Sequence, residues 1–506
     1  MSEPDEQDAT IADDIRRLHA MGYVQELARG LSGFSNFAMS LSIICILAGG
    51  VTSFHLGLCG VGGASIGLGW PLVACFSMAV AATLGQLAST FPTAGGLYHW
   101  SSILGGRGWG WVTAWFNLLG LVTVLAAINV GTFRFALGAL GPPAGTLSPT
   151  GEYLLQAAAV IAITASQAMI NHLGIRVTAR LTDFSGYWIL IVATTLAACL
   201  LAFAPGLDPA RLITFSNFSG TAGAGTWPRT ESVALLFALG ALLPAYTITG
   251  FDASAHAAEE TIGAERSVPR GIVRSVLVSG VAGWILLAAV VLAAPGLPEA
   301  AAQGEGAFVW VMRGVLPAGL ATALIAGIVL AQYLCGLATV TSASRMAFAF
   351  ARDGGLPFSA TLRQVCPRRR SPVAAVWTVA AAATAFTLWT PVYSTITAVC
   401  TIFLYISYVL PTALGARAHG RTWTAMGPWN LGRWFRPLAW VSVAGCLALI
   451  FIGMQPPNER SLWVVGGTAA TLFLAWIGGI RERFPGPPHL IELGIGINQP
   501  HQEATR

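Results

Sequence analysis

The most conspicuous chemical pair in this chain is an acid and an imidazole inside a long apolar segment. Asp252 and His256 lie four residues apart, a spacing that places two side chains on one face of a helix. Ionisable groups at membrane depth are costly and usually functional. Asp252 is therefore a candidate proton carrier, unless its side chain caps a helix that resumes after a break. His256 is a candidate coupling or gating residue, or a hydrogen-bonding residue of the core.

Glycines interrupt two apolar segments near their middle. Gly49 and Gly50 fall within the first segment, and Gly250 falls within the sixth. Glycine permits unwinding, and unwound backbone at membrane depth is tolerated only where it lines a cavity or meets a ligand. Half-helices then offer N–H groups to a carboxylate and carbonyl groups to an ammonium, which suits a zwitterion. The alternative is that the glycines only allow helices to pack closely.

Aromatic and hydroxyl side chains accompany these positions. Tyr246 and Phe251 flank the second interruption and could close over a substrate, or pack in the core. Tyr333, in the eighth segment, is a further gating candidate, and the three rings together could form the aromatic cage that a quaternary amine requires. Thr341 and Ser342 offer hydroxyl oxygens to a sodium ion, although such hydroxyls more often bond to their own helix.

The composition of the chain places these residues in a membrane. Of 506 residues, 55% are hydrophobic and only 10% are charged, against about a quarter charged in soluble domains. All 27 residues counted as Lys or Arg are Arg. Without Lys the chain has no P-loop for ATP-driven transport and no Schiff-base chemistry. The eight Cys lack metal-ligand spacing, and a net charge of +5 does not indicate nucleic-acid binding.

About twelve apolar segments of spanning length follow a polar, acid-rich start. Inner loops of membrane proteins are enriched in basic residues. When the N-terminus is placed inside, most Arg residues fall on the inner side. Those that fall outside are Arg134, Arg211, Arg229, Arg313 and Arg460. The pattern predicts a multi-pass protein of a cell inner or plasma membrane, with both termini in the cytoplasm.

Four stretches of the sequence resemble a known family. Residues 84–100 (LGQLASTFPTAGGLYHW) resemble the second-span signature of amino acid permeases in the amino acid, polyamine and organocation (APC) superfamily. Residues 344–357 resemble its eighth-span exit, and residues 48–51 sit where it has a break in the first helix. Residues 250–261 resemble the branch that carries GABA, choline and other amino acids. These motifs occur in the family's order, within a resemblance over roughly residues 22–480.

The resemblance implies an all-α membrane protein with the leucine-transporter fold. In that fold two inverted five-helix repeats are followed by two peripheral helices. We therefore expect a cytoplasmic tail over residues 1–30, a ten-helix transport core over 31–413, two peripheral helices over 414–480 and a cytoplasmic tail over 481–506.

The resemblance also implies where a substrate binds. The backbone expected to meet a substrate carboxylate comprises Ala48, Gly49, Gly50 and Val51, and that expected to meet its amine comprises Tyr246, Thr247, Ile248 and Thr249. The chain departs from the family at Gln86, where an acid is usual. Some proton-coupled relatives carry a Lys in the fifth helix, and here that region has Trp188 and Ile189. Coupling through Asp252, coupling to sodium, and exchange without an ion all stay open.

We expect a secondary transporter that moves GABA or a neutral amino acid by alternating access, coupled to protons or exchanging substrates. The alternatives are a transporter for choline or another amine, and a sensor that binds an amino acid without moving it. An enzyme is not expected, because the spans hold no cluster of catalytic spacing. The expected partners are the small-molecule substrate, the bilayer and a coupling ion, which is a proton or sodium. We expect no other cofactor, no metal and no nucleic acid. The expected oligomeric state is a monomer or a homodimer.

Overall fold

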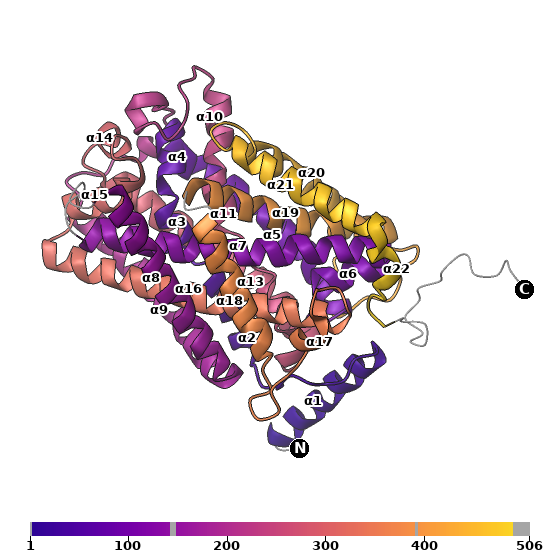
Figure 1. Cartoon of the computed structure of the whole chain (residues 1–506). Coiled ribbons are helices and arrows are strands. Elements are labelled where there is room, and N and C mark those ends of the chain that lie inside the picture. Colours follow the sequence, from indigo (N-terminus) through magenta and orange to yellow (C-terminus); the bar gives the residue numbers. More distant parts are fainter. Residues whose placement is uncertain (1–2, 142–147, 390–392, 489–506) are drawn as a thin grey trace, which may run out of the picture.

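The computed structural model describes residues 3–141, 148–389 and 393–488, and these form helices joined by short loops. Figure 1 shows long helices gathered into one bundle. The long helices are α5 (Trp70–Thr90), α7 (Arg107–Leu140), α8 (Pro149–His172), α9 (Ile175–Phe203), α13 (Ala264–Ala293), α16 (Ala318–Arg352), α18 (Val373–Trp389), α19 (Tyr393–Ala418), α20 (Phe435–Gly453) and α21 (Glu459–Ala475).

Two further segments are divided into short helices. The first segment consists of α2 (Gly33–Ile43), α3 (Gly49–Thr52) and α4 (Phe54–Val61). The sixth consists of α10 (Val233–Gly240), α11 (Leu242–Thr247) and α12 (Ala253–His256). The connecting helices are α6 (Leu97–Gly105), α14 (Leu297–Ala301), α15 (Ala307–Val315), α17 (Ser359–Leu362) and α22 (Arg481–Arg483).

The number of spans agrees with the sequence. Nine helices in the described residues are long and apolar enough to cross a membrane, and the segments Val233–Thr247 and Val373–Trp389 are shorter apolar helices. Adding the divided first segment gives twelve. A chain with this many apolar spans is a multi-pass membrane protein.

Spans five apart in the order pack against one another. Helix α5 contacts α13, α7 contacts α16, and α8 contacts α18. These are the second and seventh, third and eighth, and fourth and ninth spans. The helices α8, α9, α20 and α21 carry many exposed large hydrophobic side chains, which suits contact with lipid.

An additional helix, α1 (Glu3–Ala20), lies across one end of the bundle, far from α4 and α14 (Figure 1). We call this the α1 end. The chain after α22 lies at the same end, because Pro488 packs against Gly22 and Pro485 against Gly354. Much of the expected N-terminal tail, residues 1–30, is therefore helical and packed against the bundle. Of the expected C-terminal tail, residues 489–506 lie outside the described residues.

Candidate functional site

The first segment unwinds immediately before its glycine pair. Helix α2 ends at Ile43, residues 44–48 are not helical, and α3 begins at Gly49. The backbone N–H of Gly49 donates to the carbonyl of Cys45 at 3.0 Å. The expected break at residues 48–51 is thus shifted toward α2: Ala48 lies in the turn, whereas Gly49, Gly50 and Val51 begin the resumed helix.

The sixth segment unwinds where the sequence places its glycine. Helix α11 ends at Thr247 and α12 begins at Ala253, so Ile248, Thr249 and Phe251 lie in the break. Gly250 has φ +89°, a left-handed conformation that favours glycine. Tyr246 and Thr247 are the last residues of α11.

The two breaks touch each other in the interior. A β-carbon on Gly49 would lie only 2.8 Å from the Cα of Thr247. A β-carbon on Gly250 would overlap the side chain of Ile43, the last residue of α2. The glycines therefore allow close packing and also accompany unwound backbone. Because both breaks meet at one place, the predicted carboxylate-binding and amine-binding backbone segments are adjacent.

Helix α16 supports the first break with polar side chains. The Nε2 of Gln332 donates to the carbonyl of Leu47 at 3.0 Å, and the Sγ of Cys335 donates to the carbonyl of Ile43 at 3.4 Å. These bonds satisfy carbonyl groups that the interrupted helix leaves without N–H partners. Gln332 was not among the predicted site residues, although a glutamine within an apolar span was the available signal.

Asp252 lies at the end of the second break and is fully buried. Its Oδ1 accepts from the hydroxyl of Tyr408 at 2.7 Å, and its Oδ2 accepts from the Nδ2 of Asn117 at 2.9 Å. Nε2 of His256 lies 3.2 Å from the same Oδ2. Although Asp252 occupies the N-cap position of α12, its side chain makes no capping bond. Its partners are therefore the side chains of Tyr408, Asn117 and His256.

Tyr408 connects this acid to the backbone of the break. Its hydroxyl accepts from the N–H of Gly250 at 3.0 Å while donating to Asp252, and its ring packs on Phe251 with centroids 4.8 Å apart. Tyr408 comes from α19 and Asn117 from α7, so the site joins helices far apart in the sequence. The sequence interpretation missed both residues, because nothing in their local pattern shows which partner they meet.

Comparison with known proteins identifies the family. The family model described as amino acid permease matches residues 31–480. The chain belongs to the amino acid permease family.

Related proteins support the same assignment over nearly the whole chain. Amino-acid permease BAT1 of Arabidopsis thaliana is 32% identical over 508 residues, covering 93% of this chain and 95% of the relative. A BAT1 homolog of Oryza sativa is 32% identical over 503 residues, with the same coverage. An uncharacterized amino-acid permease of Schizosaccharomyces pombe is 27% identical over 514 residues, covering 96% and 89%. The chain is thus an amino acid transporter rather than an enzyme.

Two of the predicted residues of this permease, Tyr333 and Thr341, face α8 and not the two breaks. The hydroxyl of Tyr333 is bonded to Ser166 of α8 at 2.9 Å, on the outer side of α16. Thr341 donates to Oδ1 of Asn171 at 2.7 Å, also toward α8. The Oγ of Ser342 is buried and has no partner in the described residues. The structure therefore does not bring Tyr333 together with Tyr246 and Phe251, because the face of α16 toward the first break carries Gln332 instead.

The space beside the site is small in this conformation of the permease. A cavity of about 30 Å³ lies between Tyr246, Leu56 and Thr401. This is room for one or two water molecules. This cavity is smaller than an amino acid.

The α1 end of the permease is closed by buried ion pairs. Arg345 binds Glu260 through two hydrogen bonds of 2.9 and 3.1 Å, and Arg352 binds Glu259 through two of 2.8 and 3.0 Å. Both acids are fully buried. Each acid is thus paired with an arginine of α16. The pairs join α16 to the chain after α12.

The segment after α1 adds a second closure at this end. Asp353 accepts hydrogen bonds from the hydroxyls of Tyr23 and Tyr98, each at 2.9 Å, and lies 3.1 Å from Nε2 of His99. Burial favours the neutral acid, but the hydrogen bonds and charge of His99 and Arg352 hold the pKa of Asp353 below its usual value. Tyr23 also lies under the guanidinium of Arg352, at 3.9 Å. The ionised acid thus ties the N-terminal segment to α6 and α16.

Proposed function

We propose that this permease moves GABA or a neutral amino acid by alternating access around the two breaks. The observation that carries the proposal is the contact between them, at Gly49 with Thr247 and at Gly250 with Ile43. Unwound backbone on both sides offers N–H and carbonyl groups to the two ends of a zwitterion. The nearby acid, Asp252, already has three side-chain partners. A substrate with a net charge would therefore require a further charged side chain of the protein, in addition to Asp252.

Choline and other quaternary amines fit less well. They require aromatic rings converging on a cation, and Tyr333 faces α8 while Phe251 packs on Tyr408. The α1 end is proposed as the cytoplasmic side of a cell inner or plasma membrane, since the Arg-rich loops fall there. Under this orientation the pairs Arg345–Glu260 and Arg352–Glu259 form an inner gate.

Flux assays test the substrate assignment. The purified permease is reconstituted in proteoliposomes and offered labelled GABA, neutral amino acids and choline, under a pH gradient, a sodium gradient or neither. We expect GABA or a neutral amino acid to accumulate under the pH gradient. Accumulation of choline alone, or of none of the three, would overturn the assignment.

The proposed coupling residue is Asp252. Its buried carboxylate is held by Tyr408, Asn117 and His256 next to the substrate backbone, where gain of a proton would alter these hydrogen bonds. Asp252→Asn keeps the size of the side chain and removes its titration. We expect it to lower pH-driven uptake at least tenfold while sparing substrate exchange.

A matched variant is Asp208→Asn, at an acid in the exposed loop before Pro209. It should leave both activities unchanged. If Asp252→Asn retained the wild-type pH profile, the proton-carrier role would be refuted even if amino acid transport itself were confirmed.

A further inference from the structure

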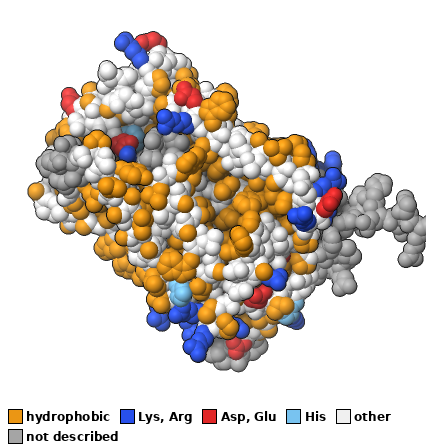
Figure 2. Space-filling view, viewed as in Figure 1, with side chains coloured by type: hydrophobic (Ala, Val, Ile, Leu, Met, Phe, Trp, Pro, Cys, Tyr) orange, Lys and Arg blue, Asp and Glu red, His pale blue; other side chains and the backbone are white. Residues whose placement is uncertain are grey.

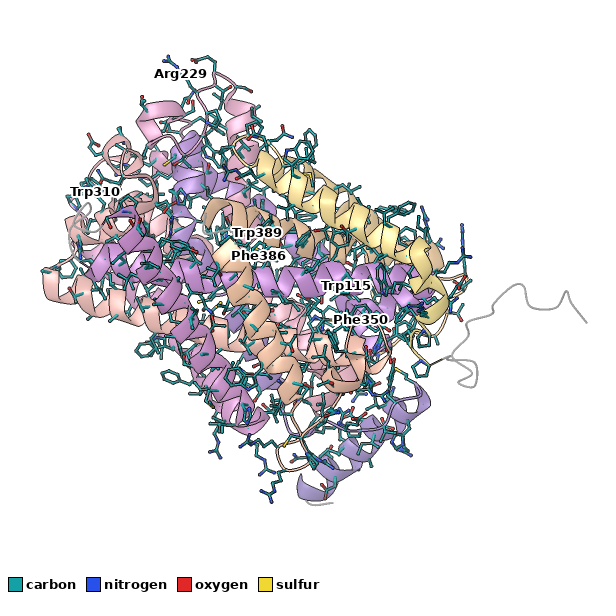
Figure 3. All side chains as sticks on the ribbon, in the orientation of Figure 1. Trp115, Arg229, Trp310, Phe350, Phe386 and Trp389 are labelled. Atoms are coloured by element: carbon teal, nitrogen blue, oxygen red, sulfur yellow. The ribbon has the colours of Figure 1, made fainter. Side chains whose placement is uncertain are left out.

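A large apolar groove opens on the surface of the bundle between α18 and α21. Its volume is about 940 Å³, and its floor is formed by α7 and α19. Figure 2 shows hydrophobic side chains gathered over this hollowed face. In Figure 3 Trp115 and Phe350 lie toward one end of this region, and Phe386 and Trp389 of α18 lie toward the other. The volume is in the range of sites for small organic ligands.

Two tryptophan side chains in the groove have unused hydrogen-bond donors. Trp111 and Trp115 both line it, and the Nε1 of each is buried without an acceptor in the described residues. Trp111 is only 2% exposed. Other lining donors are satisfied, since Thr468 and Thr471 donate to carbonyls of their own helix. Buried N–H groups without partners are uncommon and point to an acceptor supplied from elsewhere.

One end of the groove carries a positive charge. Arg483 lines it, is exposed, and has no carboxylate within ion-pair distance in the part of the chain described. Gly354 and Leu356, which follow α16, line this end too, so it lies at the α1 end. The other lining side chains are mainly aliphatic and aromatic. The groove is therefore apolar along its length and cationic at one end.

The tryptophans lie near the α1 end of a helix that is longer than a hydrocarbon core is thick. Helix α7 has 34 residues, which is about 51 Å at 1.5 Å per residue and exceeds a hydrocarbon core of about 30 Å. Trp111 and Trp115 are four and eight residues from the start of α7 at Arg107. By the same rise they lie about 6 and 12 Å from that end, where glycerol esters meet the hydrocarbon.

We infer that this groove is a binding site for an anionic glycerophospholipid of the leaflet at the α1 end. Its phosphate lies by Arg483, its ester carbonyls accept from the indole N–H groups, and its acyl chains lie along Phe386, Phe403 and Val464. A transmembrane helix from a partner or a second copy suits the groove less well. The carbonyls of such a helix are already bonded within it, so its backbone offers nothing to the tryptophans.

Native mass spectrometry of the purified full-length permease tests this site. The probes are dioleoyl phosphatidylglycerol and dioleoyl phosphatidylcholine, which differ in head group charge but share acyl chains. We expect the wild type to bind phosphatidylglycerol more tightly. Arg483→Gln should lower that affinity about fivefold, the effect of one basic side chain near an anionic lipid, and leave phosphatidylcholine affinity nearly unchanged.

Adjacent glycines of α21 provide a matched pair of variants. Gly467 lines the groove and Gly466 does not, and a β-carbon on either would meet nothing within 4 Å. Gly467→Leu should reduce binding of both lipids, whereas Gly466→Leu should not. Equal binding of the two lipids, or no effect of Arg483→Gln, would overturn the proposal. So would a dimer that Gly467→Leu dissociates, since a second copy would then be the occupant.

Discussion

The hydroxyl of Tyr408 connects two parts of the proposed transport site. It accepts from the N–H of Gly250 and donates to Asp252, so one oxygen joins the unwound backbone to the buried acid. A buried polar group that loses its only partner costs about 1–3 kcal/mol. Removal of this oxygen should therefore affect both the shape of the break and the state of the acid.

Tyr408→Phe removes the hydroxyl while keeping the ring that packs on Phe251. We expect folded protein with transport reduced at least tenfold, measured as initial uptake in proteoliposomes. Tyr405→Phe is the comparison on the same helix, because the hydroxyl of Tyr405 donates to the carbonyl of Ala245 at the longer distance of 3.3 Å. Equal losses in the two variants would contradict the special role of Tyr408.

The role of a residue could be predicted from the sequence where it depends only on residues nearby in the chain. The helical spacing of Asp252 and His256 is visible in the sequence, and the structure has their side chains 3.2 Å apart. Asn117 and Tyr408 become meaningful only when α7 and α19 pack around the sixth segment. Tyr333 was assigned to the gate without knowledge of which face of α16 meets the first break. The face of a buried helix cannot be read where every side of it is apolar.

Among the elements, the first broken helix differs in its tolerance of side chains at two neighbouring glycines. A β-carbon on Gly49 would meet backbone of α11 at 2.8 Å, whereas one on Gly50 would meet side chains at ordinary contact distance, Leu287 at 3.7 Å and Thr247 at 3.9 Å. Overpacking of a rigid contact costs about 1–3 kcal/mol. We therefore expect the same substitution to have opposite outcomes at Gly49 and Gly50.

Gly49→Ala should separate the breaks and abolish most uptake, and Gly50→Ala should retain most of it. Uptake and thermal stability of both variants, measured side by side, check this. A variant pair with equal activity would show that the contact between Gly49 and Thr247 is not required for transport.

Helix α1 is attached to the bundle through the start of another helix. The carboxylate of Asp14 accepts from the N–H groups of Gly263 and Ala264, at 2.8 and 3.1 Å, where α13 begins. An acid at this position satisfies N–H groups that the helix itself leaves free and interacts well with its dipole. Burial raises the pKa of Asp14 from its usual 3.8, although Arg29 opposes the shift.

The raised pKa gives docking of α1 a defined pH dependence. The docked helix binds the Asp14 proton more tightly than the free helix, so docking is favoured at low pH and weakens as pH rises from 3.8 through the raised value. Hydrogen exchange of α1 amides, corrected for intrinsic rates, should show this change. Asp14→Asn should remove it, and Asp8→Asn, at an exposed position, should not. A pH-independent exchange pattern in the wild type would contradict the argument.

The elements themselves followed largely from hydropathy and glycine placement. Twelve spans and the division of the first and sixth agree with the sequence. The docking of α1 could not be predicted, because its contact with α13 depends on how residues far apart in the chain meet. The shift of the first break has a similar cause: Gln332 and Cys335 of α16 bond carbonyls at Leu47 and Ile43, before the glycine pair.

At the scale of the whole molecule, the α1 end holds more buried charge than the opposite end. Glu259 and Glu260 are fully buried against Arg352 and Arg345, whereas the pair of Glu305 with Arg134 at the other end is exposed. Breaking a buried pair by removing one partner costs about 3–5 kcal/mol, and an exposed pair contributes about 0–1 kcal/mol. The closed α1 end should therefore depend strongly on the buried pairs.

Glu259→Gln should open the α1 end and expose Cys45 and Cys335, which are buried beside the first break. We expect their alkylation by a membrane-permeable maleimide to accelerate at least tenfold. Glu305→Gln serves as the control and should leave the rate unchanged. If both variants reacted at the wild-type rate, the ion pair at Glu259 would not hold this end closed.

The shared hydroxyl of Tyr408 also sets a thermodynamic constraint on the transport cycle. Any coupling free energy between two sites is reciprocal. If protonation of Asp252 changes the affinity of the break for substrate by some factor, substrate must change the proton affinity of Asp252 by that same factor. Substrate affinity measured across pH and proton uptake measured on substrate binding are therefore two measurements of one quantity.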